Sequence, residues 1–159
     1  MSRSRYHIPD EPKPSGLAHL AVDPMWPLFA QMLAGSWLGL PWFLLNSLAL
    51  GSPTRNREIL WMLFCVFGTL GLYFAYMHVV DQELLGVTAR RIAVLSFVVL
   101  KLIVGYVLYL KQSRVFEIWT YYGGQARNGV IVLMVGAFIG RAFVLDAAAN
   151  YFVLMIILA

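Results

Sequence analysis

The residue of this chain best placed to do chemistry is Lys101, which lies inside an apolar run from residue 92 to residue 110. It is midway between Arg91 and Lys111, and so about 15 Å from each at the rise per residue of an α-helix. An ionisable side chain at that depth is costly unless it faces the interior of a helix bundle or water, and such residues mark ion and proton pathways. The favoured interpretation is a lysine that snorkels partway, with its ammonium group satisfied by hydroxyls or backbone carbonyls. The alternative is a role in the passage of an ion, a proton or a substrate.

Two hydroxyl side chains are expected at the depth of Lys101. Counting inward from the predicted loops places Ser36 and Thr69 at about the same level of the membrane. We predict a mid-membrane polar layer of Ser36, Thr69 and Lys101, with Trp37 offering a cation–π face.

The remaining polar residues of the apolar runs have simpler interpretations. Arg141 and Asp146 are expected to snorkel toward the far interface. His78, with Asp81 and Glu83 at spacings of three and five, could line a metal or proton site, but helix-end polar residues at the interface are the favoured interpretation. Hydrolase and nucleotide-binding motifs are absent from the sequence, so we predict no catalytic, metal or cofactor site and a non-enzymatic protein.

These residues must be positioned by membrane-spanning helices. The chain has 159 residues, of which 60% are hydrophobic and 13% charged, whereas about a quarter of the residues of a soluble domain are charged. Residues 59–80 carry no formal charge and are long enough to cross the ~30 Å hydrocarbon core. We predict an all-α integral membrane bundle of four transmembrane helices at about residues 25–50, 59–80, 92–110 and 129–155, preceded by a flexible tail at residues 1–24.

Irregularities are predicted within these elements. Pro41 should kink the first span. Residues 111–128, which combine aromatic side chains with the Gly123-Gly124 turn signal, are expected at headgroup level as a short helix lying flat. The last apolar stretch is too long for one straight span, so we expect one imperfect helix that bends at Gly136 or Gly140.

Charge patterning constrains the partners. The net charge of +4 is spread along the tail and the connections, which argues against nucleic-acid binding because that requires a basic face. Counting Lys and Arg by predicted face gives five on each side, so orientation is not fixed; weighting residues near the span ends favours both termini outside. The single cysteine, Cys65, is expected to act as a small core hydrophobe.

Small residues suggest how the helices pack. Three pairs have the spacing that lets helix backbones approach closely in a membrane: Gly35 with Gly39, Gly71 with Ala75, and Gly136 with Gly140. Most of these faces should pack within one bundle, and one left over would bind another membrane protein or a second copy.

Several motifs resemble a known group. These are the segment from Ala34 to Gly39, Asn46, the segment from Ala49 to Gly51, and Gln112 followed by Tyr122-Gly123-Gly124. Over residues 28–141 the chain is similar to small polytopic bacterial membrane proteins that carry no assigned function. The resemblance implies four spans in a bacterial inner membrane and supplies no catalytic residue.

Two functions are favoured by these features, and a third, an intramembrane hydrolase or metalloenzyme, would need further ligands near His78. The first is a non-enzymatic helper, scaffold or interaction subunit of a membrane assembly, a class that includes proteins that neutralise membrane-active toxins. The alternative is a small oligomeric transporter or channel with Lys101 in its polar layer. The expected partners are the lipid bilayer and another membrane protein or a second copy.

Overall fold

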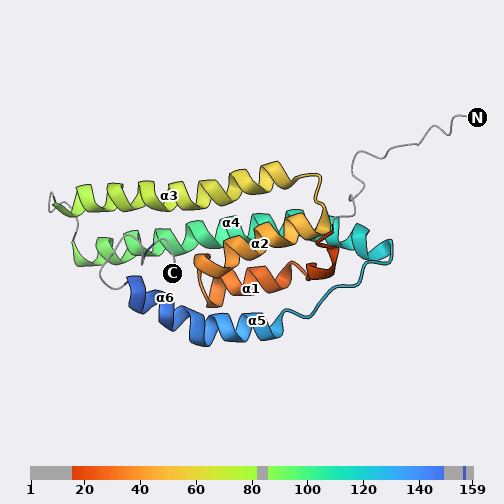
Figure 1. The fold of residues 1–159 in the computed structure, drawn as a ribbon. Helices are drawn as coiled ribbons and strands as arrows, with labels where there is room; N and C mark the ends of the chain where they lie inside the picture. The colour runs from red at the N-terminus through yellow and green to blue at the C-terminus, as the bar shows by residue number, and fades with distance from the viewer. Residues whose placement is uncertain (1–15, 82–85, 149–155, 157–159) are drawn as a thin grey trace, which may run out of the picture.

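The computed structural model describes residues 16–81, 86–148 and 156, and the described residues are helical without any β-strand. This confirms the predicted all-α bundle (Figure 1). Three segments are long and apolar enough to cross a membrane, namely Arg55–Val80, Thr88–Tyr121 and Val130–Ala147, and a shorter apolar helix covers Ser36–Leu50. In order along the chain the elements are η1 (Ala18–Leu20), α1 (Met25–Leu33), α2 (Ser36–Leu50), α3 (Arg55–Asp81), α4 (Val87–Tyr121), α5 (Val130–Val135), η2 (Gly136–Gly140) and α6 (Arg141–Ala148).

The first predicted span, residues 25–50, is wrong as a single helix. It consists of α1 and α2, which are separated at Ala34 and Gly35 and lie side by side as an antiparallel hairpin (Figure 1). Gly35 has φ 110°, a left-handed conformation that only glycine adopts without strain. The chain therefore reverses at Gly35, and α2 continues through Pro41.

The hairpin enters the bundle from one end and returns to the same end. The open end of the hairpin lies near the α4–α5 connection, while its turn lies partway along α4 (Figure 1). At ~1.5 Å per residue α1 is about 14 Å and α2 about 22 Å long, both shorter than the hydrocarbon core. This is the geometry of a re-entrant hairpin, and we call its turn the hairpin tip.

The fourth helix, α4, is longer than predicted. It continues from the predicted span through Tyr121, so residues 111–121 are not a separate helix lying flat. This segment contains no glycine or proline to stop it, and the helix ends only before Gly123, which has φ 90°. The aromatic residues of this segment therefore belong to α4, the helix that contains the third predicted span, residues 92–110.

The last helix confirms the predicted bend. α5, η2 and α6 are continuous, and Gly136–Gly140 forms a π-helical segment of the kind that interrupts regular helices. A Cβ at Gly140 would lie 2.5 Å from the Trp37 ring, and one at Gly136 would collide with Leu38. The bend therefore accommodates α2. The predicted end of this span, residues 149–155, lies outside the described residues.

Part of the predicted flexible tail is ordered. Ala21 and Val22 are buried, because the backbone N–H of Val22 donates to Asn46 Oδ1 at 2.9 Å and Ala21 O accepts from the backbone N–H of Arg127. Residues 1–15 lie outside the described residues.

The surface of the bundle is more apolar than that of a soluble protein, and several polar side chains are buried. Large apolar side chains such as Phe67, Ile92 and Phe138 are more than 60% exposed, whereas polar ones such as Asn46, Glu58 and Gln112 are buried. Outward apolar surface is what lipid requires. The chain is membrane-embedded.

Candidate functional site

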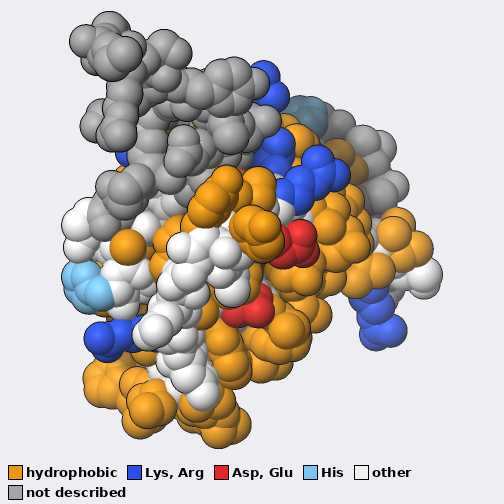
Figure 2. Space-filling model, turned by 90° about the vertical axis from the view of Figure 1, so that its right-hand side faces the viewer, with side chains coloured by type: hydrophobic (Ala, Val, Ile, Leu, Met, Phe, Trp, Pro, Cys, Tyr) orange, Lys and Arg blue, Asp and Glu red, His pale blue; other side chains and the backbone are white. Residues whose placement is uncertain are grey.

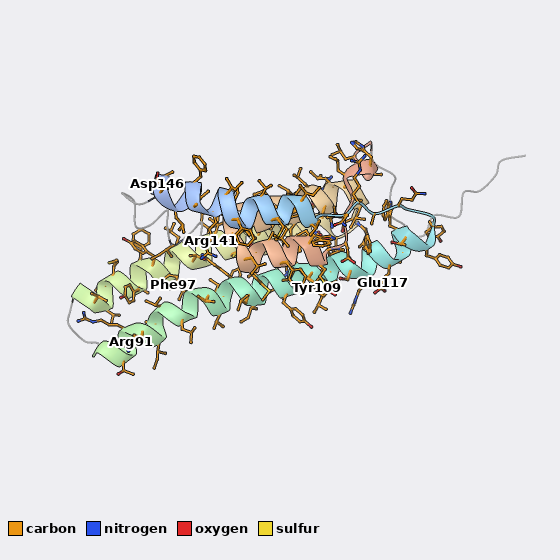
Figure 3. All side chains as sticks on the ribbon, turned by 90° about the horizontal axis from the view of Figure 1, so that it is seen from below. Arg91, Phe97, Tyr109, Glu117, Arg141 and Asp146 are labelled. Carbon is orange, nitrogen blue, oxygen red and sulfur yellow. The ribbon has the colours of Figure 1, made fainter. Side chains whose placement is uncertain are left out.

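The hairpin tip has its backbone carbonyls satisfied by side chains. Trp37 Nε1 donates to Ala34 O at 2.9 Å, and Arg141 Nη1 donates to Leu33 O at 2.6 Å. Leu33 is the last residue of α1, so the guanidinium group lies at the negative end of that helix dipole. An unsatisfied carbonyl in lipid costs several kcal/mol, so both contacts stabilise irregular backbone within the bilayer. Arg141, expected to snorkel, points instead toward the hairpin tip (Figure 3), and its side chain is exposed.

A cavity of about 490 Å³ lies beside the hairpin tip, and we call it the central cavity. Its walls come from α1, α3, α4 and α6, together with Ile156. Lys101 and Arg141 both line it, and none of the described residues in its wall is acidic. Lys101 Nζ donates to Ile156 O at 2.5 Å. The central cavity is therefore lined by two basic side chains near the turn of the hairpin.

Gln31 connects the central cavity to the hairpin tip. Its side chain lines the cavity and is only 5% exposed. Its Nε2 donates to Ser36 Oγ at 3.0 Å, and its Oε1 has no hydrogen-bond partner among the described residues. A primary amide has both donor and acceptor capacity, so Gln31 offers a polar contact that the protein does not use.

The three side chains of the predicted polar layer do not hydrogen-bond to one another, and each has a different partner. Ser36 bonds to Gln31, Thr69 Oγ1 donates to Cys65 O at 2.6 Å within its own helix, and Lys101 bonds to Ile156. A threonine inside a helix commonly bonds back to the carbonyl four residues earlier. Ser36 is connected to Lys101 only indirectly, because Gln31 bonds to Ser36 and lines the same cavity as Lys101. Trp37, predicted to face Lys101, instead packs on Gly140.

A second polar cluster is centred on Gln112, and it was not predicted from the sequence. Its Oε1 accepts from Asn46 Nδ2 at 3.0 Å, and its Nε2 donates to Phe43 O at 2.8 Å and to Glu58 Oε2 at 2.9 Å. Gln112 lies on α4, Asn46 on α2 and Glu58 on α3. One side chain thus joins three helices.

Glu58 is fully buried, and hydroxyls hold its other oxygen. Ser52 Oγ and Thr54 Oγ1 donate to Glu58 Oε1 at 2.6 and 2.7 Å. With Gln112 this gives three donors to one carboxyl group, an arrangement that suits a carboxylate, which only accepts. We call Asn46, Ser52, Thr54, Glu58 and Gln112 the polar clasp. In the sequence, the polar clasp could have been inferred from Asn46, which lies inside an apolar run. A polar side chain in a membrane commonly hydrogen-bonds to another helix.

Comparison with family models, with curated proteins and with solved structures found no match to this chain. The geometry of these two sites is therefore the basis for assigning a function.

The predicted packing pairs have different outcomes. A Cβ at Gly39 would lie 2.6 Å from the Cα of Gln31, so Gly39 is where α1 and α2 meet. Gly71 and Ala75 are exposed, and a Cβ at Gly71 would meet nothing within 4 Å. Within the described bundle this pair packs against no other helix, because α3 turns this face outward.

The re-entrant hairpin also changes the grouping of charges. The chain before α1 and the α2–α3 connection lie at the same end (Figure 1), although the sequence predicts opposite faces. We call this the basic end, and Lys and Arg side chains gather there among apolar ones (Figure 2). The described cations on this side of the bundle are Arg55, Arg57, Lys111, Arg114 and Arg127, against Arg90 and Arg91 near the opposite end.

The possible metal site at His78 gains no support from the described residues. They contain no group of three or more His, Cys, Asp or Glu side chains that could hold a metal ion. Glu83 and the side chain of Asp81 lie outside the described residues.

Proposed function

We propose that this protein is a small transporter or channel that passes an anionic solute through the bilayer by way of the central cavity. The observation that carries the proposal is the meeting of Lys101 and Arg141 with the hairpin tip in a cavity whose described wall has no acidic residue. Irregular backbone at membrane depth is tolerated where it is buried in protein or lines a water-filled cavity. Helices that stop within the bilayer are the elements with which many transporters bind their substrates.

The hydrogen-bonding capacity of the two cations supports an anionic ligand. An ammonium group has three donors and a guanidinium group five. Lys101 makes one hydrogen bond among the described residues, and Arg141 also makes one. The remaining donors are available beside apolar walls such as Phe97 and Leu102. Because a low-dielectric wall strengthens charge interactions, a small anion would bind there better than in water.

The proposal includes an assembly and an orientation. The bundle is small, so a second copy would complete the passage, as the sequence already predicted. By the positive-inside rule the basic end would face the cytoplasm, in a bacterial inner membrane if the resemblance holds.

Replacing Lys101 by methionine tests the proposal. We expect anion flux in liposomes to fall at least about tenfold, since one of the two cavity charges is removed, while insertion and helix content stay unchanged. Arg127→Met is the matched control, because it removes an exposed cation at the basic end. Unaltered flux in Lys101→Met would show that this lysine only satisfies the Ile156 carbonyl, and the proposal would fail.

A second candidate function is the helper, scaffold or interaction subunit, toxin neutralisation included. It is favoured by the outward face of α3, where Gly71 and Ala75 are exposed next to Phe67 and Phe74. Small residues on a lipid-facing helix allow another helix to approach closely. Like the transporter proposal, this function is non-enzymatic.

The change Gly71→Leu separates the two candidates. We expect it to abolish binding of a partner helix to α3 without changing the fold, because a side chain there meets open space. The measurement is purification in mild detergent followed by mass determination of the intact complex. A stoichiometric foreign protein that disappears in Gly71→Leu supports the interaction subunit, whereas a complex unaffected by Gly71→Leu contradicts a role for this face.

A further inference from the structure

A second cavity, of about 520 Å³, lies toward the basic end of the bundle. It is formed by the α2–α3 connection and the first turn of α3 on one side and by α4 on the other. Three cations line it, Arg57 from α3 and Lys111 and Arg114 from α4, and no acidic side chain does among the described residues. We call it the basic cavity. It shares no lining residue with the central cavity.

We propose that the basic cavity binds the headgroup of an anionic phospholipid. Basic pockets between transmembrane helices on the positively charged side of a membrane protein suit phosphate headgroups. Arg57 and Arg114 are exposed and come from opposite walls, while Lys111, three residues before Arg114 on α4, is half-buried. A phosphodiester can accept from all three, and the guanidinium groups can bind it through two parallel hydrogen bonds.

The apolar part of the wall favours a lipid over a soluble phosphate. Val107 and Leu110 line the cavity one turn deeper in the membrane than Lys111 and Arg114, on the same face of α4 by helical spacing. Leu110 is 44% exposed, so the apolar wall opens toward the lipid. An acyl chain attached to a headgroup at Arg114 would lie along this surface and bury it.

The nearby carboxyl groups are not part of the wall of this cavity. Glu58 adjoins Arg57 in the sequence, but it is fully buried and both of its oxygens accept hydrogen bonds within the polar clasp. Glu117 lies on α4 (Figure 3) but is not part of the cavity wall. Thr54 joins the two features, because its hydroxyl bonds to Glu58 while the residue lines the cavity.

Lipid retention measured by native mass spectrometry tests the proposal. The detergent-purified protein is titrated with phosphatidylglycerol or with phosphatidylcholine, and we expect clear preference for phosphatidylglycerol. Arg114→Gln and Arg57→Gln, which alter opposite walls, should each weaken that binding about fivefold, the effect of about 1 kcal/mol per cation near anionic lipid. Arg127→Gln removes a cation of the same end that does not line the cavity, and it should leave binding unchanged.

Three outcomes would overturn the proposal. Equal retention of both lipids would show that the charge of the headgroup is not recognised. An equal loss in Arg127→Gln would mean that the charge of the whole end attracts the lipid. Competition by soluble glycerol phosphate as effective as that by phosphatidylglycerol would identify a free-phosphate site. Because these measurements do not involve flux, they are independent of the proposed transport.

Discussion

Replacing Gln112 by leucine is expected to lower the free energy of unfolding by about 3–5 kcal/mol, the range found when one partner of a buried charged network is removed. The change deletes the hydrogen bonds to Asn46, Phe43 O and Glu58. Each bond contributes about 1 kcal/mol, and a buried group left without a partner costs a further 1–3 kcal/mol. Unfolding by a denaturing detergent, followed by circular dichroism, measures the loss.

The matched control for Gln112→Leu is Gln125→Leu. Gln125 is an exposed glutamine in the α4–α5 connection, so the same change of side chain should alter the free energy of unfolding by less than about 0.5 kcal/mol. Equal effects at the two positions would mean that the polar clasp does not stabilise the bundle.

A double substitution separates the hydrogen bonds from the packing. Glu58→Met should cost less in the Gln112→Leu background than in the wild-type chain, because the carboxylate has already lost one donor there. Residues in one hydrogen-bond network show interaction energies of about 0.5–3 kcal/mol in such cycles. Strictly additive effects would contradict the contact between Gln112 and Glu58.

The sequence was sufficient to predict the helical membrane fold because apolar runs report directly on burial in lipid. The three long spans and the bend near Gly136 follow from run length and from glycine position. Hydropathy does not distinguish a helix that crosses the membrane from a hairpin that returns. Residues 25–50 are apolar in both cases, and the decisive feature is the backbone of Gly35, whose φ of 110° is a property of the folded chain.

The candidate sites were less predictable, because they depend on which helices become neighbours. Lys101 could be identified from its depth alone, but its partner Ile156 is 55 residues away in the chain. Glu58 and Gln112 flank predicted spans and look like interfacial residues in the sequence. Once the hairpin brings Asn46 beside α4, both become core residues. A polar residue just outside an apolar run therefore cannot be assigned to solvent before the packing is known.

The close approach of α1 and α2 leads to the second large prediction, for Gly39→Val. A Cβ at this position would lie 2.6 Å from the Cα of Gln31 and 2.7 Å from its Cβ. The Cα and Cβ of Gln31 cannot move aside as the end of a flexible side chain can. The two helices of the hairpin must therefore separate. We expect destabilisation beyond the ~1–3 kcal/mol typical of overpacking, together with loss of the contact between Arg141 and the Leu33 carbonyl.

The single cysteine reports on the opening of the hairpin. Cys65 is 1% exposed and belongs to the same core cluster as Leu40 and Phe43 of α2. When Gly39→Val displaces α2, the Cys65 thiol becomes accessible. Its rate of modification by N-ethylmaleimide in mild detergent should therefore rise at least about tenfold. A buried thiol reacts only when the structure around it opens locally, so even partial opening increases the rate. Gly71→Val is the control, because it places the same side chain in a helix where a Cβ meets nothing within 4 Å. An unchanged rate in Gly39→Val would contradict the packed hairpin, and with it the re-entrant geometry on which the central cavity depends.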